Sequence, residues 1–150
     1  MASESPPDVI AIACDHGGYA LKTILAEDLR DSGLQVLDLG TNSPESVDYP
    51  TYGKAVAEAL LDGKAGRGVL VCGTGIGMDI TANRFKGVRA ANCHCAEVAR
   101  LARQHNDANV LVLGGRFIDE DTARQCLRAF LDTEFEGGRH QRRVAMFDES

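Results

Sequence analysis

The sequence lacks any apolar run of about 18 residues or more, the length that a transmembrane helix requires. It also lacks the features of a secretory signal, because the opening segment MASESPPDV contains neither a basic stretch nor an apolar core. We therefore expect a cytoplasmic protein with no membrane partner.

Positive charge is scarce as well. The chain has 16 Lys and Arg against 22 Asp and Glu, which gives a net charge of −6. Nucleic-acid binding depends on a basic surface, so this balance excludes general nucleic-acid binding. An anionic ligand would need a local basic pocket, and the segment GGRHQRR, residues 137–143, gathers three arginines and a histidine in one place.

The five cysteines, an odd number scattered along the chain, are Cys14, Cys72, Cys93, Cys95 and Cys126. This pattern argues against a disulfide framework and favours reduced thiols, most of them buried as small apolar residues. The triplet Cys93-His94-Cys95 lacks the second ligand pair that a zinc site needs, so we expect no metal and no cofactor.

Short apolar runs and helical stripes alternate along the 150 residues. The runs predict buried strands at 9–14, 34–39, 68–72, 87–93 and 108–114. Helical spacing of apolar residues predicts helices around 21–29, 52–60 and 123–131, the first closed by Gly33, and a further helix over 75–85.

This alternation predicts a single domain with a three-layer Rossmann-like α/β fold: a five-stranded parallel sheet with helices on both faces. Only about residues 1–8 and the last few are expected to be flexible. In such sheets ligands bind outside the carboxyl ends of the strands, so we look for chemistry directly after each strand.

The segment CGTGIG, residues 72–77, follows the third predicted strand. Its glycines allow a tight turn and leave N–H groups open to an anion, and the following helix N-terminus favours a thiolate at Cys72. A buried structural cysteine and a close strand-to-helix turn are the alternative explanations. A dinucleotide fingerprint would need glycine, and a cysteine phosphatase arginine, at the position of Met78; the Gly-Lys-Ser/Thr of a P-loop never occurs.

Two further candidates contain histidine. Asp15 and His16 follow the first strand and are suited to bind hydroxyls or a phosphate, although Asp15 could simply cap the next helix. His105 lies four residues after Leu101, on what we interpret as the apolar face at the end of its helix. Such a histidine is more often packed than catalytic, and Asn106 could cap the helix or bind a sugar hydroxyl.

Arginines supply the remaining candidates. Arg116 follows the fifth strand and can reach a ligand at the carboxyl edge. Arg139 and Arg143 share one face if their segment is helical, and guanidinium groups bind phosphate oxygens bidentately. A solvated charged face is the ordinary alternative, and a terminal segment can also reach a neighbouring subunit.

Taken together, the motifs CDHGG, SVDYP, VCGTGIGM, ANRFKGVRAA, RQHNDANVLVLGGR and FEGGRHQRRV resemble the ribose/galactose isomerase family, which includes ribose-5-phosphate isomerases of type B and galactose-6-phosphate isomerase subunits. The resemblance runs from about residue 9 to 145. It implies a cofactor-free aldose-ketose isomerase that interconverts D-ribose 5-phosphate and D-ribulose 5-phosphate through a cis-enediolate, in the pentose phosphate pathway.

The resemblance also implies roles for individual residues. Cys72 is the base that moves a proton between C2 and C1, and Thr74 and His105 open the furanose ring. The remaining implied contacts hold the enediolate, the sugar hydroxyls or the phosphate: Gly73, Gly75, Ile76, Gly77, Asp15, Asn106, His16, Arg116, Arg139 and Arg143. Family members share active sites between subunits, so we expect a homodimer or tetramer in which the segment 137–150 packs on a neighbour.

Two other functions stay open. The first is an isomerase of a six-carbon sugar phosphate, such as allose 6-phosphate or galactose 6-phosphate, because residues outside these motifs set the depth of the pocket. The second is a non-catalytic phosphosugar-binding module, which would need neither Cys72 nor His105.

Overall fold

The computed structural model describes residues 7–149, and these contain a five-stranded parallel sheet in the order β2-β1-β3-β5-β4. The strands are β1 (Val9–Cys14), β2 (Gln35–Asp38), β3 (Arg67–Cys72), β4 (Ala90–Asn92) and β5 (Val110–Gly114). The predicted Rossmann-like α/β fold is confirmed. Residues 1–6, the greater part of the segment expected to be flexible, lie outside the described residues; the Asp8 carbonyl accepts a 2.9 Å hydrogen bond from the N–H of Gln35.

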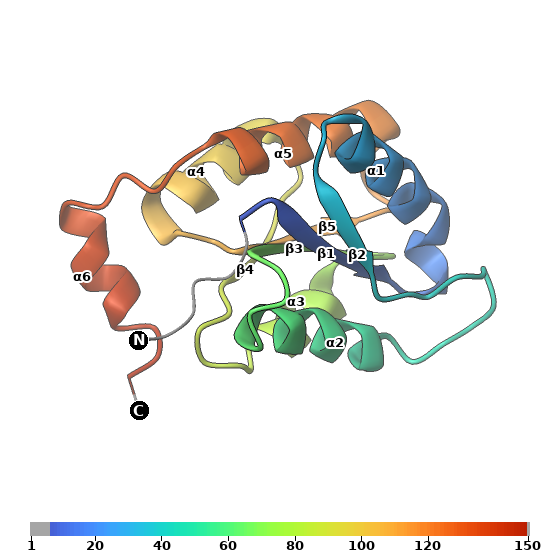
Figure 1. Ribbon diagram of the computed structural model, residues 1–150, viewed down its shortest axis with the longest axis horizontal. Coiled ribbons are helices and arrows are strands. Elements are labelled where there is room, and N and C mark those ends of the chain that lie inside the picture. Colours follow the sequence, from blue (N-terminus) through green and yellow to red (C-terminus); the bar gives the residue numbers. More distant parts are fainter. Residues whose placement is uncertain (1–6, 150) are drawn as a thin grey trace.

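Helices cover both faces of this sheet (Figure 1). They are α1 (Tyr19–Asp31), α2 (Tyr49–Leu61), α3 (Ile76–Ala82), α4 (Ala96–Asn106), α5 (Glu120–Asp132) and α6 (Arg139–Ala145), with a 3₁₀ turn, η1 (His16–Gly18), before α1. Figure 1 shows α1, α4 and α5 on one face, α2 and α3 on the other, and α6 beyond one end of the sheet. No helix in this described part combines the length and apolarity needed to cross a membrane.

Two apolar layers hold these elements together. Along β1, Ile10 and Ile12 face the layer under α1, α4 and α5, whereas Ala11 and Ala13 face the layer under α2 and α3. Since both faces of the central strands β1, β3 and β5 are buried, these strands are nearly continuous apolar runs rather than alternating ones. This is why they could be recognised from sequence.

The helix stripes are buried as predicted. In α1, Leu25 and Leu29 are fully buried, and Gly33 follows the helix with φ +85°, its N–H bonded to the Arg30 carbonyl at 3.0 Å. A left-handed residue directly after a helix is the usual terminator, and glycine adopts that conformation without strain. The predicted end of α1 is therefore confirmed in its mechanism as well as its place.

The strands predicted at 34–39 and 108–114 are slightly shorter, as β2 and β5, and two other elements are much shorter than expected. The helix expected over 75–85 is α3, which ends at Ala82, and the strand expected over 87–93 is only Ala90–Asn92. The Asn83 side chain explains both limits, because it receives the N–H of Ala90 at 2.8 Å and donates to the carbonyl of the same residue at 2.9 Å. This local pairing replaces a longer helix and a longer strand.

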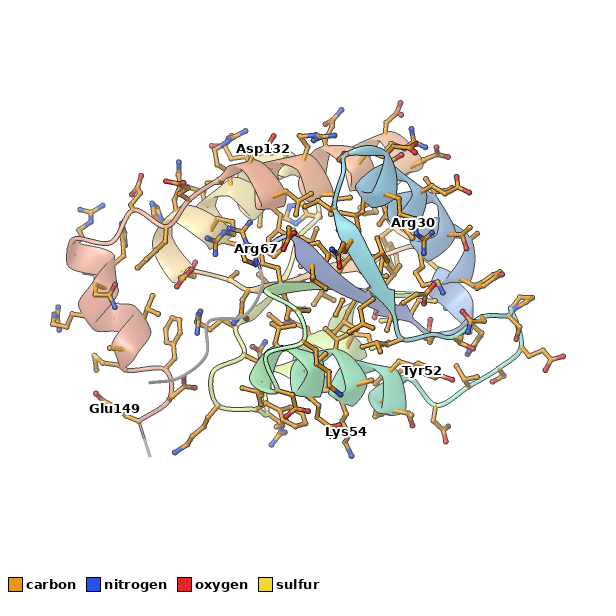
Figure 2. All side chains as sticks on the ribbon, in the orientation of Figure 1. Arg30, Tyr52, Lys54, Arg67, Asp132 and Glu149 are labelled. Atoms are coloured by element: carbon orange, nitrogen blue, oxygen red, sulfur yellow. The ribbon has the colours of Figure 1, made fainter. Side chains whose placement is uncertain are left out.

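One charged side chain, that of Arg67, stabilises the end of the sheet opposite the predicted ligand edge. Arg67, labelled in Figure 2 at the amino end of β3, donates to the carbonyls of Phe130 at 2.7 Å and Leu131 at 3.2 Å. It thereby ties the end of α5 to the sheet. Lys54, by contrast, points away from the sheet on the exposed side of α2 (Figure 2).

Candidate active site

The chain order of the strands places one crevice at the carboxyl edge of the sheet. From β1 the chain leaves to β2 on one side, and β3, β5 and β4 lie on the other, so β1 and β3 flank the point where the winding direction changes. Ligands of open α/β sheets bind at such a switch point. Asp15 follows β1 here and its N–H bonds to the Val71 carbonyl at 3.2 Å, directly beside Cys72.

The sulfur of Cys72 is held by the backbone that follows it. Its Sγ accepts a hydrogen bond from the N–H of Gly75 at 3.0 Å, and the residue is 5% exposed. Gly75 has φ +82°, which directs its N–H back toward the strand end. A donor aimed at the sulfur stabilises negative charge there, so the geometry suits a thiolate.

Other N–H groups of the same loop are open. The N–H of Ile76 bonds to the Thr74 hydroxyl at 3.1 Å, but those of Gly73 and Thr74 have no partner within residues 7–149. Unpaired backbone donors at a strand end form a concave anion site. The loop can therefore stabilise an oxyanion next to the thiol.

Each glycine of this loop also makes room for a neighbouring side chain. A Cβ on Gly73 would lie 3.1 Å from Nε of Arg116, and one on Gly75 would lie 2.7 Å from Oδ1 of Asn92. The ring of Tyr49 lies against Gly77 in the same way. The alternation of glycines thus reflects close packing as well as a tight turn.

Asp15 and His16 are fixed in position beside the loop. The Asp15 carboxylate caps η1 by accepting the N–H of Gly18 at 3.1 Å, which confirms the capping role. Nδ1 of His16 accepts the N–H of Val47 at 3.2 Å, so its Nε2 is the nitrogen left to donate.

A buried lysine anchors the neighbouring segment. Lys22 is 2% exposed, and its Nζ contacts both carboxylate oxygens of Asp38 at 3.0 Å and the Thr41 carbonyl at 2.8 Å. A buried ammonium group needs such a full set of partners. The contact fixes the chain after β2, the same segment that reaches His16 through Val47.

Arg116 belongs to the same edge. Its backbone N–H bonds to the Gly73 carbonyl at 3.0 Å, while the N–H of Gly115 bonds to the Cys72 carbonyl at 2.8 Å. The guanidinium group lies over Gly73, because a Cβ on this glycine would be 3.1 Å from Nε and 3.2 Å from Cζ of Arg116. One chain therefore brings together Cys72, Asp15 and Arg116, together with His16 and the glycine loop.

The other predicted site residues lie at the opposite edge. His105 and Asn106 end α4, and Arg139 and Arg143 are exposed on α6, which is helical as the arginine spacing required. In Figure 1, α6 lies beyond the amino ends of the strands, whereas β1 ends at η1 on the far side. Within one chain these four residues do not meet Cys72.

The predicted orientation of His105 is wrong. The core-facing residues of α4 are Ala99, Ala102 and Arg103, while Leu101 is 38% exposed and the His105 side chain 39% exposed. Small alanines let α4 pack closely on α5, so the larger Leu101 did not mark the buried face. His105 instead stacks on His140, with ring centroids 4.3 Å apart.

Sequence reasoning did not select Tyr49, Asn92, Glu136 or His140. Tyr49 and Asn92 border the glycine loop, and the Asn92 side chain also donates to the Thr74 carbonyl at 3.2 Å. Tyr49 belongs to SVDYP, and Glu136 and His140 belong to FEGGRHQRRV, so the motifs held a signal for these three; nothing in the local sequence marked Asn92.

The remaining cysteines are chiefly core residues. Burial raises the pKa of Cys14 to about 11, that of Cys126 to about 11 and that of Cys93 to about 12. These thiols stay protonated at neutral pH, when they are poor nucleophiles. The expectation that most cysteines are free and buried is confirmed.

Known proteins resemble the chain over nearly its whole length. Ribose-5-phosphate isomerase B of Escherichia coli is 46% identical over 135 residues, covering 90% of this chain and 91% of that protein. The crystal structure of a ribose 5-phosphate isomerase from Thermotoga maritima has 50% identity and a TM-score of 0.93, covering 95% of this chain and 98% of that one.

A third relative carries a ligand. Ribose-5-phosphate isomerase B of Mycoplasma genitalium, solved with bound ribulose-5-phosphate, is 42% identical with a TM-score of 0.88, and 91% of each chain is covered. Residues 10–147 match the family described as Ribose/Galactose Isomerase. With this match and these identities, the chain belongs to the ribose/galactose isomerase family.

Proposed function

We propose that this protein is an aldose-ketose isomerase that interconverts D-ribose 5-phosphate and D-ribulose 5-phosphate through a cis-enediolate, in the pentose phosphate pathway. The observation that carries this proposal is the sulfur of Cys72 at the switch point, with the N–H of Gly75 bonded to it. Relatives named ribose-5-phosphate isomerase B, one of them with ribulose-5-phosphate bound, support the choice of substrate.

In the proposed reaction the Cys72 thiolate removes the proton from C2 of the open-chain aldose. The electrons of that C–H bond form the C1–C2 double bond, and the charge comes to rest on O1. The thiol then returns the proton to C1, while the O2 proton moves to O1 and leaves the ketone at C2. Because a carbon acid is weak, the base must lie within about 3 Å of it in a pocket poor in water.

The backbone of the glycine loop stabilises the enediolate. We assign O1 of the enediolate to the open N–H groups of Gly73 and Thr74. Gly75, Ile76 and Gly77 form the rest of the substrate-binding loop, in which the N–H of Gly75 bonds to the sulfur and that of Ile76 to the Thr74 hydroxyl. Donors fixed in advance at a developing charge are among the strongest catalytic contributions. No cofactor takes part in this scheme.

The rest of the site comes from a second copy of the chain. The carboxyl edge of the sheet holds Cys72, Thr74, Asp15, His16 and Arg116. The other proposed site residues lie at the amino edge, at the end of α4 and on α6. We assign the ring-opening proton transfer to Thr74 and to the partner's His105. The partner also contributes Asn106 to bind sugar hydroxyls, and the arginines of α6, Arg139 and Arg143, to bind the phosphate beside His16 and Arg116.

This assignment implies a homodimer or tetramer whose C-terminal segment, residues 137–150, packs on a neighbour. We further propose that each chain is one domain and that the protein is cytoplasmic. Exposed apolar side chains beside the site suit such a contact: Ile76 is 57% exposed and Phe117 76% exposed. Local arginines also explain how an acidic chain binds an anionic sugar.

A six-carbon substrate is the second candidate, because the depth of the completed pocket depends on both copies. A coupled assay of the purified protein against five- and six-carbon aldose phosphates decides between them. We expect the highest kcat/KM for ribose 5-phosphate, and a higher value for allose 6-phosphate or galactose 6-phosphate would reverse the assignment.

The decisive variant for catalysis is Cys72→Ser. A serine hydroxyl at this place is far less acidic than a thiol, so kcat should fall by roughly 10²-fold or more while substrate binding stays measurable by calorimetry. Cys95→Ser, which alters a partly exposed thiol outside the site, is the matched control and should keep full activity. Undiminished turnover in the Cys72 variant would rule out the proposed base, and a binding module would show no turnover in either protein.

A further inference from the structure

Three potential ligands meet where α6 approaches the end of α4. Nε2 of His105 lies 3.9 Å from Oε1 of Glu136, and Nε2 of His140 lies 3.5 Å from the same oxygen. The three ligand atoms all fall within 4.8 Å of one another. Two imidazoles and a carboxylate are thus gathered from two segments of the chain, the end of α4 and residues 136–140.

Backbone contacts hold this cluster in place. The N–H of Glu136 bonds to the Gln104 carbonyl at 3.1 Å, and the N–H of His140 bonds to the Gly137 carbonyl at 3.0 Å. His140 is only 7% exposed, and its ring is stacked on that of His105 at an interplanar angle of 16°. The fold therefore fixes His140 and the backbone of Glu136, while the side chains of Glu136 and His105 are free enough to adjust to an ion.

The charges around the cluster favour a cation as its ligand. The last turn of α4, which contains His105, directs its free carbonyls toward this region, and these favour a bound positive ion. Glu136 supplies the negative charge that a cation needs, and the neighbouring Arg139 and Arg143 limit the affinity.

We propose that His105, Glu136 and His140 form a binding site for a divalent transition-metal ion such as Zn²⁺, Co²⁺ or Ni²⁺. Two imidazoles with one carboxylate are a common ligand set for these ions and leave a position for water. The rings of His105 and His140 are stacked nearly parallel, and two parallel rings cannot both direct Nε2 at one ion. The His105 ring must therefore turn toward the ion. Its 39% exposure leaves room for that rotation.

The ion would have a consequence for the enzyme. A bound metal occupies Nε2 of His105 and fixes α6 to α4, so His105 could no longer transfer a proton during ring opening. Inhibition by the metal rests on the function proposed above, whereas binding of the metal does not. The two parts can therefore be tested separately.

Binding is tested with Co²⁺ on the full-length protein. Nitrogen and oxygen ligands give weak visible bands, whereas thiolate ligands add intense near-ultraviolet absorption, so the spectrum separates this cluster from the cysteines. We expect one Co²⁺ per chain without the thiolate band, measured together with calorimetry. Glu136→Gln and His140→Asn should each weaken binding by more than about tenfold, since loss of even an outer-shell partner costs about 10–100-fold.

His94→Asn is the matched control, because His94 is an exposed histidine beside two cysteines and outside the cluster. It should leave Co²⁺ binding unchanged, and circular dichroism checks that each variant is folded. If His140→Asn fails to fold, Glu136→Gln still tests the site. Glu136 is half exposed, so its substitution should not disturb folding. Equal Co²⁺ affinity in wild type and Glu136→Gln, or a spectrum dominated by thiolate, would overturn the site.

Inhibition is tested with Zn²⁺ in the isomerase assay. Activity should fall as Zn²⁺ fills the site, return with a chelator, and resist Zn²⁺ in Glu136→Gln by the same factor as the loss of Co²⁺ affinity. Metal binding without inhibition would retain the site and reject the role of His105. Activity without metal binding would reject the site and leave the isomerase intact.

Discussion

Gly17 and Gly18 are adjacent in sequence but have different surroundings. A Cβ on Gly18 would lie 2.6 Å from the carbonyl oxygen of Val71 in β3, whereas one on Gly17 would make its closest contact at 3.4 Å, with the Asp15 side chain. Backbone of a central strand cannot move aside as a side-chain end can. Only one of the two positions therefore requires glycine for reasons of space.

We predict that Gly18→Ala destabilises the protein by about 1–3 kcal/mol, the usual range for overpacking a well-packed site. Gly17→Ala should change stability much less, because its contact is of ordinary van der Waals length. Urea unfolding followed by circular dichroism measures both. A loss in Gly18→Ala as small as that in Gly17→Ala would show that η1 can shift away from β3.

At the scale of the secondary structure, α5 begins with a capping carboxylate. The side chain of Asp119 accepts the N–H of Thr122 at 2.7 Å. Hydrogen bonding by the Thr122 side chain, and then by this N–H, lowers the pKa of Asp119. A carboxyl whose pKa is lower in the folded state stabilises the fold above its unfolded pKa. That contribution disappears as the pH falls through the folded value.

Asp119→Ala should therefore lower the urea midpoint at neutral pH, and its difference from wild type should shrink as the pH falls below about 4. Asp119→Asn is the control, because asparagine caps a helix without titrating. The urea midpoint of Asp119→Asn should lie close to that of wild type at neutral pH. Its difference from the midpoint of Asp119→Ala should not change as the pH falls. A deficit of Asp119→Ala that stays constant into acid would assign the stabilisation to something other than the ionised cap.

Which elements could be predicted from sequence follows from how each is stabilised. β1 was predicted at its observed limits, and the stripe of α5 was correct, because burial of apolar side chains alone decides these elements. α3 and β4 end where Asn83 pairs with Ala90, a contact between residues seven apart that apolar periodicity does not reveal. The face of α4 was misjudged because alanine and the stem of Arg103 cover its core side.

For the whole molecule, the site residues divide by topology. A helix that follows a parallel strand starts near the carboxyl edge and ends near the amino edge, so His105 at the end of α4 is carried away from Cys72. The strand-end residues could be predicted as neighbours because one sheet edge collects them. In the proposed assembly, the position of His105 and the α6 arginines relative to Cys72 would be set by a second copy, which a single sequence does not describe.

Mixing two inactive variants tests this division directly. Cys72→Ser removes the base from the carboxyl edge, and His105→Asn removes the donor from the amino edge, so each should have little activity alone. If every site pairs Cys72 of one chain with the partner's His105, a mixed dimer contains one intact site and one doubly altered site. Refolding the two variants together in equal amounts should then restore about one quarter of wild-type activity, because half of the dimers are mixed and half of their sites are intact. Activity that stays at the level of the separate variants, in a sample shown to exchange subunits, would mean that both residues serve the same chain's site.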